Sequence, residues 1–457
     1  MGIDRAVQNH VGYEAYGEYF ALFNFSFLLN IFLDLGLTNY NNRNVAQSHV
    51  MFHKYLGTLL RLKLWLGVVY AALTLVLGLV LGYDSKAFEL MGLLALNQFL
   101  ISFILFLRSN LSGLFLFKTD SIMSVLDRCL LILFVGFLLY FDNGSLLTIR
   151  TFILAQTLAY ALVVVVLLII LFRIKERIST KVKSRFSIAV VKQSLPFALL
   201  VLLMTLYTKT DAVMLERMLP DGKLYTGIYA QGYRLLEALN MIAFLFSTLL
   251  LPTFSRMIKN SVPVASLSLS ASKLLSVFAF GAALMAFLFK EPIITAMYPD
   301  AVERSYEIFP MLLLCIIPIS GTYVYGTLLT AAGNLKWLNM MAVGGLMLNV
   351  LLNVLLIPRY DVMGAVVATI ITQFATFFVQ LYISKEYHRL FAAVGVLIKQ
   401  LAIVVVVFVA HSGLNLFLSL WWCFVLDALL YIGISVGLKQ VELKYFWQML
   451  RSREQAV

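Results

Sequence analysis

The chain has 457 residues, of which 61% are hydrophobic and only 13% are charged, and its mean hydropathy is +0.91. Soluble domains carry about 25% charged residues and under 50% apolar ones, so this composition excludes a soluble globular protein. The 35 Lys and Arg residues outnumber the 23 Asp and Glu residues. In so apolar a chain, this excess indicates loops that face anionic lipid rather than a nucleic-acid partner.

Apolar segments long enough to span a bilayer recur along the whole chain, since one spanning helix needs about 20 apolar residues. The first five are Tyr16–Leu37, Leu64–Leu81, Phe88–Leu107, Ser121–Phe141 and Thr148–Phe172. The others are Leu195–Met218, Tyr225–Leu251, Leu267–Phe289, Ser305–Ala331, Trp337–Ile357, Met363–Ser384, Val394–Ala410 and Leu416–Leu438. These thirteen segments predict an all-α polytopic membrane protein without a soluble domain.

Positive residues alternate strongly between successive loops. One set of alternate loops, which includes the C-terminal tail, holds 23 Lys and Arg residues, and the opposite set holds 7. Cytoplasmic loops carry the excess of Lys and Arg, so we expect the first set and the C-terminus to lie in the cytoplasm.

A short internal repeat relates two of the predicted helices. Gly-x-Tyr opens one helix at Gly17 and another at Gly227, and each helix ends near a cytoplasmic arginine, Arg43 or Arg256. The second copy is preceded by Leu195–Met218, and the same offset from Gly17 falls before the chain begins. We therefore expect that a first helix is missing and that about 20 further apolar residues belong upstream.

The repeat divides the chain into parts. They are an N-terminal bundle at 1–172, a basic cytoplasmic linker at 173–194, a C-terminal bundle at 195–384, an extra helix pair at 385–438 and a tail at 439–457. The tail is predicted to be an interfacial amphipathic helix or a solvated segment. Parallel repeats are typical of transporters that bind their substrate between the halves.

Cysteine and histidine give no sign of a metal or a cofactor. Cys129, Cys315 and Cys423 lie far apart in apolar runs. His49 and His53 have ligand spacing but belong to a basic loop, so the sequence predicts neither a metal site nor a cofactor.

The run Asn349–Thr369 resembles the NxxLNxxLIPxYGxxGAAxAT signature of O-antigen and polysaccharide flippases, with Asp361 where the family usually has Gly. Tyr207–Met214, Gly227–Ala230 and Tyr325–Gly333 match other landmarks of this family in the same order. The family belongs to the multidrug/oligosaccharidyl-lipid/polysaccharide exporter superfamily. The resemblance implies two MATE-like six-helix bundles related by a pseudo-twofold axis, with two extra C-terminal helices.

The resemblance also implies a function. Such a protein turns an undecaprenyl-diphosphate-linked oligosaccharide across the bacterial inner membrane for O-antigen, capsule or exopolysaccharide synthesis, without acting as an enzyme. The implied partners are the lipid-linked oligosaccharide, membrane lipids and polysaccharide polymerase or assembly proteins, with no nucleic acid. A diphosphate cannot cross hydrocarbon alone, so we expect cationic groups at membrane depth.

Four charged residues interrupt two predicted spans. Lys209 and Asp211 lie in the first, and Arg234 and Glu237 lie three apart on one face of the next. They are either salt bridges that join helices or contacts with the cargo, because charges at this depth face a cavity or one another. We interpret Arg234 and Lys209 as diphosphate contacts in a cavity between the bundles.

Three further residues are candidates near the cytoplasmic side. Asp34 is either a protonatable coupling group or a hydrated interfacial carboxylate. Arg43 and Arg256 occupy equivalent helix ends, where they either meet entering phosphate or serve as positive-inside anchors.

Two other functions remain as alternatives. A cation-coupled multidrug exporter shares the fold, but Lys209 and Arg234 would repel cationic drugs. A membrane glycan polymerase or ligase needs a large outer loop, and the longest one here, Lys290–Arg304, has fifteen residues.

Overall fold

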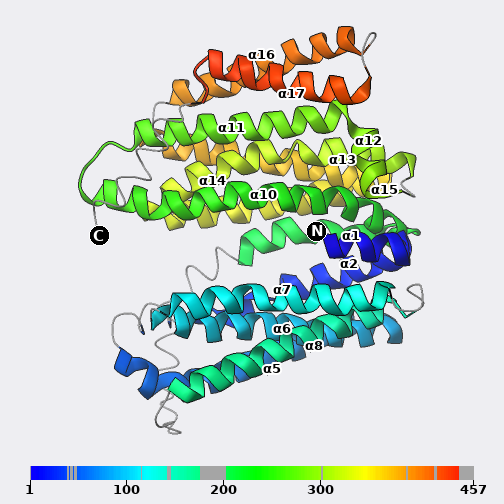
Figure 1. The fold of residues 1–457 in the computed structure, drawn as a ribbon, viewed down its shortest axis with the longest axis vertical. Coiled ribbons are helices and arrows are strands. Elements are labelled where there is room, and N and C mark those ends of the chain that lie inside the picture. The colour runs from blue at the N-terminus through cyan, green and yellow to red at the C-terminus, as the bar shows by residue number, and fades with distance from the viewer. Residues whose placement is uncertain are drawn as a thin grey trace. The chain divides into compact units, whose positions relative to one another are not determined.

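The structure is a computed structural model that describes residues 2–38, 41, 45, 49–114, 116–140, 146–174, 202–299, 302–387, 390–415 and 419–441. These residues form two compact units, 2–227 and 228–457, each described here by itself. All their regular elements are helices (Figure 1), which confirms the predicted all-α class. The predicted linker at 173–194 falls mostly outside the described residues.

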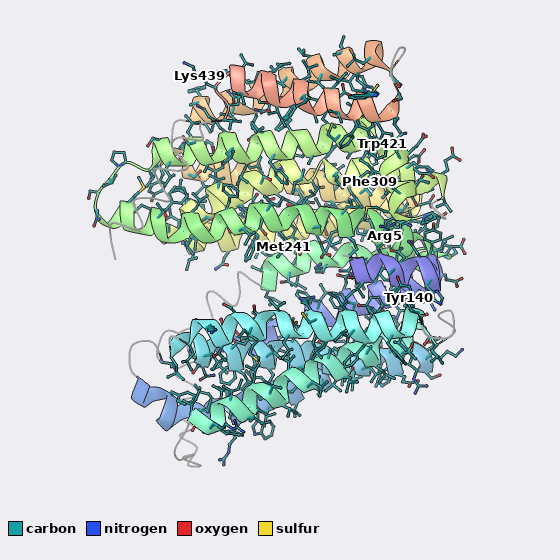
Figure 2. All side chains as sticks on the ribbon, viewed as in Figure 1. Arg5, Tyr140, Met241, Phe309, Trp421 and Lys439 are labelled. Carbon is teal, nitrogen blue, oxygen red and sulfur yellow. The ribbon has the colours of Figure 1, made fainter. Side chains whose placement is uncertain are left out.

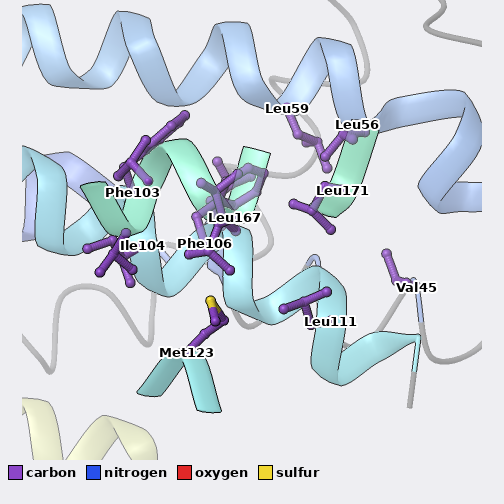
Figure 3. Packing of buried hydrophobic residues seen from close by; sticks show 14 of the residues in the cluster. Val45, Leu56, Leu59, Phe103, Ile104, Phe106, Leu111, Met123, Leu167 and Leu171 are labelled. Atoms are coloured by element: carbon purple, nitrogen blue, oxygen red, sulfur yellow. The ribbon is translucent and has the colours of Figure 1, made fainter. Parts of the chain in front are cut away.

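The unit at 2–227 is built around three long helices. In chain order its helices are α1 (Gly2–Val11), α2 (Tyr13–Leu28), α3 (Ile31–Asp34), α5 (His49–Val80), α6 (Ser85–Gly113), α7 (Phe117–Tyr140), α8 (Ile149–Ile174), a helix at 202–218 and the first turns of α10 (Gly222–Lys259). Side chains such as Leu59, Phe106 and Leu167 from α5, α6 and α8 interlock in its core (Figure 3). Burying such side chains provides about 25 cal/mol per Å² of apolar surface.

The unit at 228–457 holds the rest of α10 and the later helices. They are α11 (Ala265–Leu288), α12 (Lys290–Met297), α13 (Glu303–Leu313), α14 (Ile316–Ala331), α15 (Leu335–Ile383), η2 (Ser384–Glu386), α16 (Leu390–Leu414) and α17 (Leu420–Gly437). One core gathers α10, α11, α14 and the end of α15 around Phe254, Leu275 and Phe377. A smaller core joins α16 and α17 to α11.

Two breaks in these helices have local causes. The span at 303–331 divides into α13 and α14 at Leu314 and Cys315, because Pro318 has no N–H to donate to the Leu314 carbonyl and its ring crowds that carbonyl. Within α15 the backbone turns at Asp361, with φ 52° and ψ −136°, and this turn separates two predicted spans. Glycine adopts such a positive φ without strain, which explains why the resembling family has Gly at this position.

Nine helical stretches of the described residues are long and apolar enough to cross a membrane. They cover ten of the thirteen predicted segments, because Leu335–Glu386 contains two of them. Of the other three, Tyr16–Leu37 is broken into α2 and α3, Tyr225–Leu251 lies within α10, and Leu195–Met218 is described only from residue 202. Large side chains such as Tyr140 (89% exposed) and Trp421 (79% exposed) project from the surface (Figure 2), as expected for lipid-facing helices.

Candidate functional site

Lys209 lies in the middle of the helix at 202–218, in the unit at 2–227. Its Nζ atom is 5.8 Å from the ring centroid of Phe27 on α2, within the range of a cation–π interaction. Lys209 is half-buried, whereas Asp211, two residues further along, is 1% exposed. The two side chains therefore have different surroundings, as the spacing of two residues predicts.

Arg234 and Glu237 lie one turn apart on α10, in the unit at 228–457. Arg234 Nη1 donates to Glu237 Oε2 at 3.1 Å, so the predicted pairing on one helical face is present. The side chains are 15% and 33% exposed. This pair lies within one helix, so by itself it does not fix the position of a neighbouring helix.

Asp34 forms a buried ion pair that the sequence reasoning missed. Its Oδ1 atom lies 2.6 Å from Lys63 Nζ on α5, and Lys63 also donates to Ser102 Oγ at 2.8 Å. Asp34 further accepts hydrogen bonds from the backbone N–H and hydroxyl of Thr38. Lys63 is one of the 23 positive residues that the charge asymmetry assigns to cytoplasmic loops, and this assignment is wrong, because Lys63 is a fully buried residue of α5. Asp34 is 28% exposed and is thus only partly hydrated.

The structure describes little of the two arginines that are predicted to lie at equivalent helix ends. Arg43 lies outside the described residues, and of Arg256 only the backbone is described, in the last turn of α10.

The two glycines of the internal repeat lie against one another within the unit at 2–227. A Cβ on Gly17 would lie 1.9 Å from the backbone oxygen of Lys223 and 2.7 Å from the backbone nitrogen of Gly227. A Cβ on Gly227 would lie 2.2 Å from the backbone oxygen of Tyr13. The side chain of Gln8 donates to the Gly227 carbonyl at 3.0 Å. Helices α2 and α10 therefore cross in backbone contact, which only residues without a Cβ allow.

Beside this crossing, Arg217 links two loops that are far apart in sequence. Its guanidinium carbon lies 3.6 Å from the ring centroid of Tyr83, and its Nη2 donates to the Leu81 carbonyl at 2.7 Å. The Tyr83 hydroxyl donates to Glu216 Oε2 at 3.0 Å. The sequence reasoning passed over Glu216 and Arg217 because they lie at the end of a predicted span.

Burial and neighbouring charge keep this cluster in its paired form. Burial raises the pKa of the Tyr83 phenol above its usual value, so the hydroxyl remains a donor to Glu216. Burial opposes the charge on Lys223, yet its pKa is raised because the hydrogen bond and charge of Glu18 outweigh that effect. Lys223 Nζ lies 3.0 Å from Glu18 Oε1 on α2. We call Glu18, Tyr83, Glu216, Arg217 and Lys223 the loop cluster.

The charged side chains of this arrangement can bind ions or ionic groups. Groups of three or more His, Cys, Asp or Glu placed to hold a metal ion do not occur within the described ranges. The loop cluster and the glycine crossing lie at one end of the unit at 2–227, where α5 ends and α10 begins. The charge asymmetry of the loops predicts that this end faces outward.

The sequence of residues 6–258 matches the family described as polysaccharide biosynthesis protein. No curated protein matches the chain in sequence.

Several solved membrane proteins share the fold. One is a lipid II flippase MurJ in an inward closed conformation, with a TM-score of 0.73 and 14% identity over 98% of this chain and 96% of that one. Another is an inward-facing multidrug resistance MATE family transporter, with a TM-score of 0.69 and 15% identity over 86% of this chain and 94% of that one. A third, from Pyrococcus furiosus, is a superfamily transporter with a binding pocket of reverse polarity; its TM-score is 0.57 at 14% identity, over 84% of this chain and 91% of that one.

Proposed function

Because the chain belongs to the polysaccharide biosynthesis protein family, we propose that it flips an undecaprenyl-diphosphate-linked oligosaccharide across the bacterial inner membrane. The product would serve O-antigen, capsule or exopolysaccharide synthesis. The likeness of its fold to a lipid II flippase supports a polyprenyl-diphosphate cargo of this kind.

The observation that carries the proposal is the placement of Lys209. It is a half-buried cation in the middle of a helix, held over the Phe27 ring at 5.8 Å. A cation–π contact provides about 0.5–2 kcal/mol. Charge-assisted hydrogen bonds to phosphate oxygens are stronger than neutral ones, so a diphosphate can displace the ring. The aromatic contact thus stabilises the ammonium between transport cycles without blocking its ligand.

Arg234 is the second proposed diphosphate contact. Its ion pair with Glu237 lies within one turn of α10, so a phosphate can replace this carboxylate without a change in the distance between two helices that this pair would have to hold. A guanidinium binds phosphate oxygens with two parallel hydrogen bonds, which a lysine cannot do. Arg256, in the last turn of α10, and Arg43 are proposed to meet the headgroup where it enters from the cytoplasmic leaflet.

The contacts of the glycine crossing and the loop cluster fit a transport cycle. A flippase opens its pathway to one side at a time. The glycine crossing and the loop cluster must separate when the pathway opens at their end. Their contacts are hydrogen bonds, one cation–π pair and backbone packing, all of which can break reversibly.

The test uses the full chain reconstituted in liposomes with a fluorescent polyprenyl-diphosphate oligosaccharide. We expect the chain to move the headgroup of this lipid to the other leaflet and to leave the chemical structure of the lipid unchanged. The accessibility of the headgroup to an impermeant quencher measures the movement. Lys209→Ala and Arg234→Ala should each lower the rate at least about tenfold, the equivalent of 1.4 kcal/mol. Arg234→Lys should retain part of the activity because the charge persists.

Two outcomes would favour the other functions. Movement of a cationic dye but not of the oligosaccharide would indicate a multidrug exporter, like the MATE transporter that shares the fold. A longer or transferred glycan in the product would indicate a polymerase or ligase. Lys399→Ala, an exposed lysine on α16, is the matched control and should not change the rate.

A further inference from the structure

Aromatic residues recur along one face of α2. Tyr16, Tyr19, Phe23 and Phe27 follow one another at intervals of three or four residues, so their side chains share one side of the helix. The centroids of successive rings are 5.4, 6.0 and 6.0 Å apart. These four rings form a continuous row, which we call the aromatic row. It begins beside the glycine crossing and ends at Phe27, next to Lys209.

The two ends of the aromatic row differ in burial. Both tyrosines are enclosed, at 0% and 1% exposed. The Tyr19 ring lies 5.4 Å from that of Phe152 in an edge-to-face arrangement, and its hydroxyl accepts a hydrogen bond from Gln156 Nε2 at 3.3 Å. Phe23 and Phe27 are only half-buried. The tyrosines therefore belong to the core of the unit at 2–227, whereas the two phenylalanines keep part of their surface accessible.

The two accessible rings have the chemistry that recognises sugars. An aromatic face carries partial negative charge. The faces of a sugar ring carry C–H groups with a slight positive charge, so sugars stack on aromatic side chains, and the stacking also buries apolar surface. The planes of Phe23 and Phe27 differ by only 29°, so their faces point in similar directions. Side by side along the helix, they can support two successive sugars.

The ring of Phe27 lies directly beside the proposed diphosphate contact. Lys209 Nζ lies over this ring, 5.8 Å from its centroid. When the ammonium moves to a diphosphate, as the proposed function requires, it leaves the ring face. The first sugar of a lipid-linked oligosaccharide is bonded directly to the diphosphate, so it arrives where the ammonium has left. Phe23, one turn further along α2, then lies where the second sugar follows.

We propose that Phe27 and Phe23 form a sugar-binding subsite, on which the first two sugars of the cargo stack while Lys209 binds the diphosphate. This inference rests on the proposed function and adds to it the residues that bind the glycan. The subsite selects a lipid that carries a glycan over one that carries only the diphosphate. It accepts different sugars, because stacking does not depend on a particular pattern of hydroxyl groups. The alternative is that both rings only pack α2 against its neighbours.

The experiment measures the binding of three lipids to the full chain, purified in a detergent without sugar. The lipids are undecaprenyl diphosphate alone and the same lipid with one or with two N-acetylglucosamine residues. We expect the wild type to bind the one-sugar lipid about three to ten times more tightly than the bare lipid. Phe27→Leu keeps an apolar side chain but removes the aromatic face, so it should lose most of this preference. Its affinity for the bare lipid should be equal or higher, because no ring competes for the Lys209 ammonium.

Phe23→Leu separates the two positions of the subsite. It should bind the one-sugar lipid as the wild type does and lose the additional affinity that the second sugar provides. The matched control is Phe172→Leu, which removes a phenylalanine that is 43% exposed on α8. This control should bind all three lipids as the wild type does.

Three outcomes would overturn the subsite and leave the proposed function intact. They are equal wild-type affinities for the bare and the one-sugar lipid, a Phe27→Leu variant that keeps the preference, and a Phe27→Leu variant that loses affinity for both lipids equally. The first of these decides even if neither variant folds. An unchanged affinity of Phe23→Leu for the two-sugar lipid would overturn the second sugar position. A wild type that binds none of the lipids would instead overturn the proposed function, and the subsite with it.

Discussion

The long-range contacts of the loop cluster and the local pair of Arg234 and Glu237 do different work, although the unit at 228–457 also holds a long-range ion pair, between Arg304 Nη2 and Asp361 Oδ2 at 3.6 Å. In the unit at 2–227 the contacts of the loop cluster join elements that are distant in sequence, such as Lys223 to Glu18 and Tyr83 to Glu216, which are 205 and 133 residues apart. In the unit at 228–457, Arg234 pairs with Glu237 only three residues away. A long-range contact can exist only when the helices take up a particular arrangement, whereas a local pair survives any movement of the helix as a whole. The first kind therefore helps to set conformation, whereas the second places little constraint on how the helices are arranged.

The largest effect on stability is expected at the buried pair of Asp34 and Lys63. Asp34→Asn leaves the fully buried Lys63 ammonium without its counter-charge, and breaking such a pair costs about 3–5 kcal/mol. Lys63→Met should cost less, because Asp34 is 28% exposed and can be hydrated. Thermal unfolding in detergent measures the loss of stability in each of the two variants.

The double variant Asp34→Asn with Lys63→Met sharpens the interpretation of Asp34. If the pair is structural, the double variant should be more stable than Asp34→Asn alone and should still transport. A stable double variant that has lost only transport would instead support a coupling role for Asp34.

The second-largest effect on stability is expected at the glycine crossing. Gly17→Ala places a Cβ 1.9 Å from the Lys223 carbonyl, so the helices must separate, and overpacking of this kind costs about 1–3 kcal/mol. Gly92→Ala, on α6 with nothing within 4 Å of its Cβ, is the matched control and should be neutral or slightly stabilising. The measurement is the thermal midpoint together with the transport rate. Equal effects of the two substitutions would show that the crossing is not under steric constraint.

A smaller effect is expected for the loop cluster. Arg217→Ala removes the cation–π contact with Tyr83 and the bond to the Leu81 carbonyl, which together contribute about 1–2 kcal/mol. The paired arrangement of the loop cluster is then populated less. A cysteine pair at Glu18 and Lys223, in a chain whose three native cysteines are replaced, should form a disulfide more slowly when Arg217→Ala is added. An unchanged rate of disulfide formation would mean that Arg217 does not stabilise the paired arrangement of the loop cluster.

The smallest effect on stability is expected at Arg234 and Glu237. A pair three residues apart on one helix contributes about 0.2–0.5 kcal/mol, so Glu237→Gln should leave the thermal midpoint and the membrane abundance nearly unchanged. If Arg234→Ala lowers abundance and adding Glu237→Ala restores both abundance and export, Arg234 is structural. The diphosphate would then be held by other residues.

Local features of the sequence were sufficient to predict most of the helices and one ion pair. Runs of apolar residues identify spans because a bilayer demands about 20 of them, and ten of the thirteen predicted segments lie in helices long and apolar enough to cross it. The pairing of Arg234 with Glu237 also follows from the sequence, since residues three apart share a helical face. The repeat identified Gly17 and Gly227 as equivalent positions.

Only the tertiary structure decided which distant residues meet. That the two equivalent glycines touch, that Lys63 reaches Asp34 and that His411 reaches Asp427 depends on how neighbouring helices pack. The helical period fixes the faces of one helix but says nothing about which face of another helix opposes it. In a membrane the sequence says even less about which helix faces meet, because most exposed positions are apolar whichever way a helix is turned. Pairing partners therefore leave no pattern in the sequence.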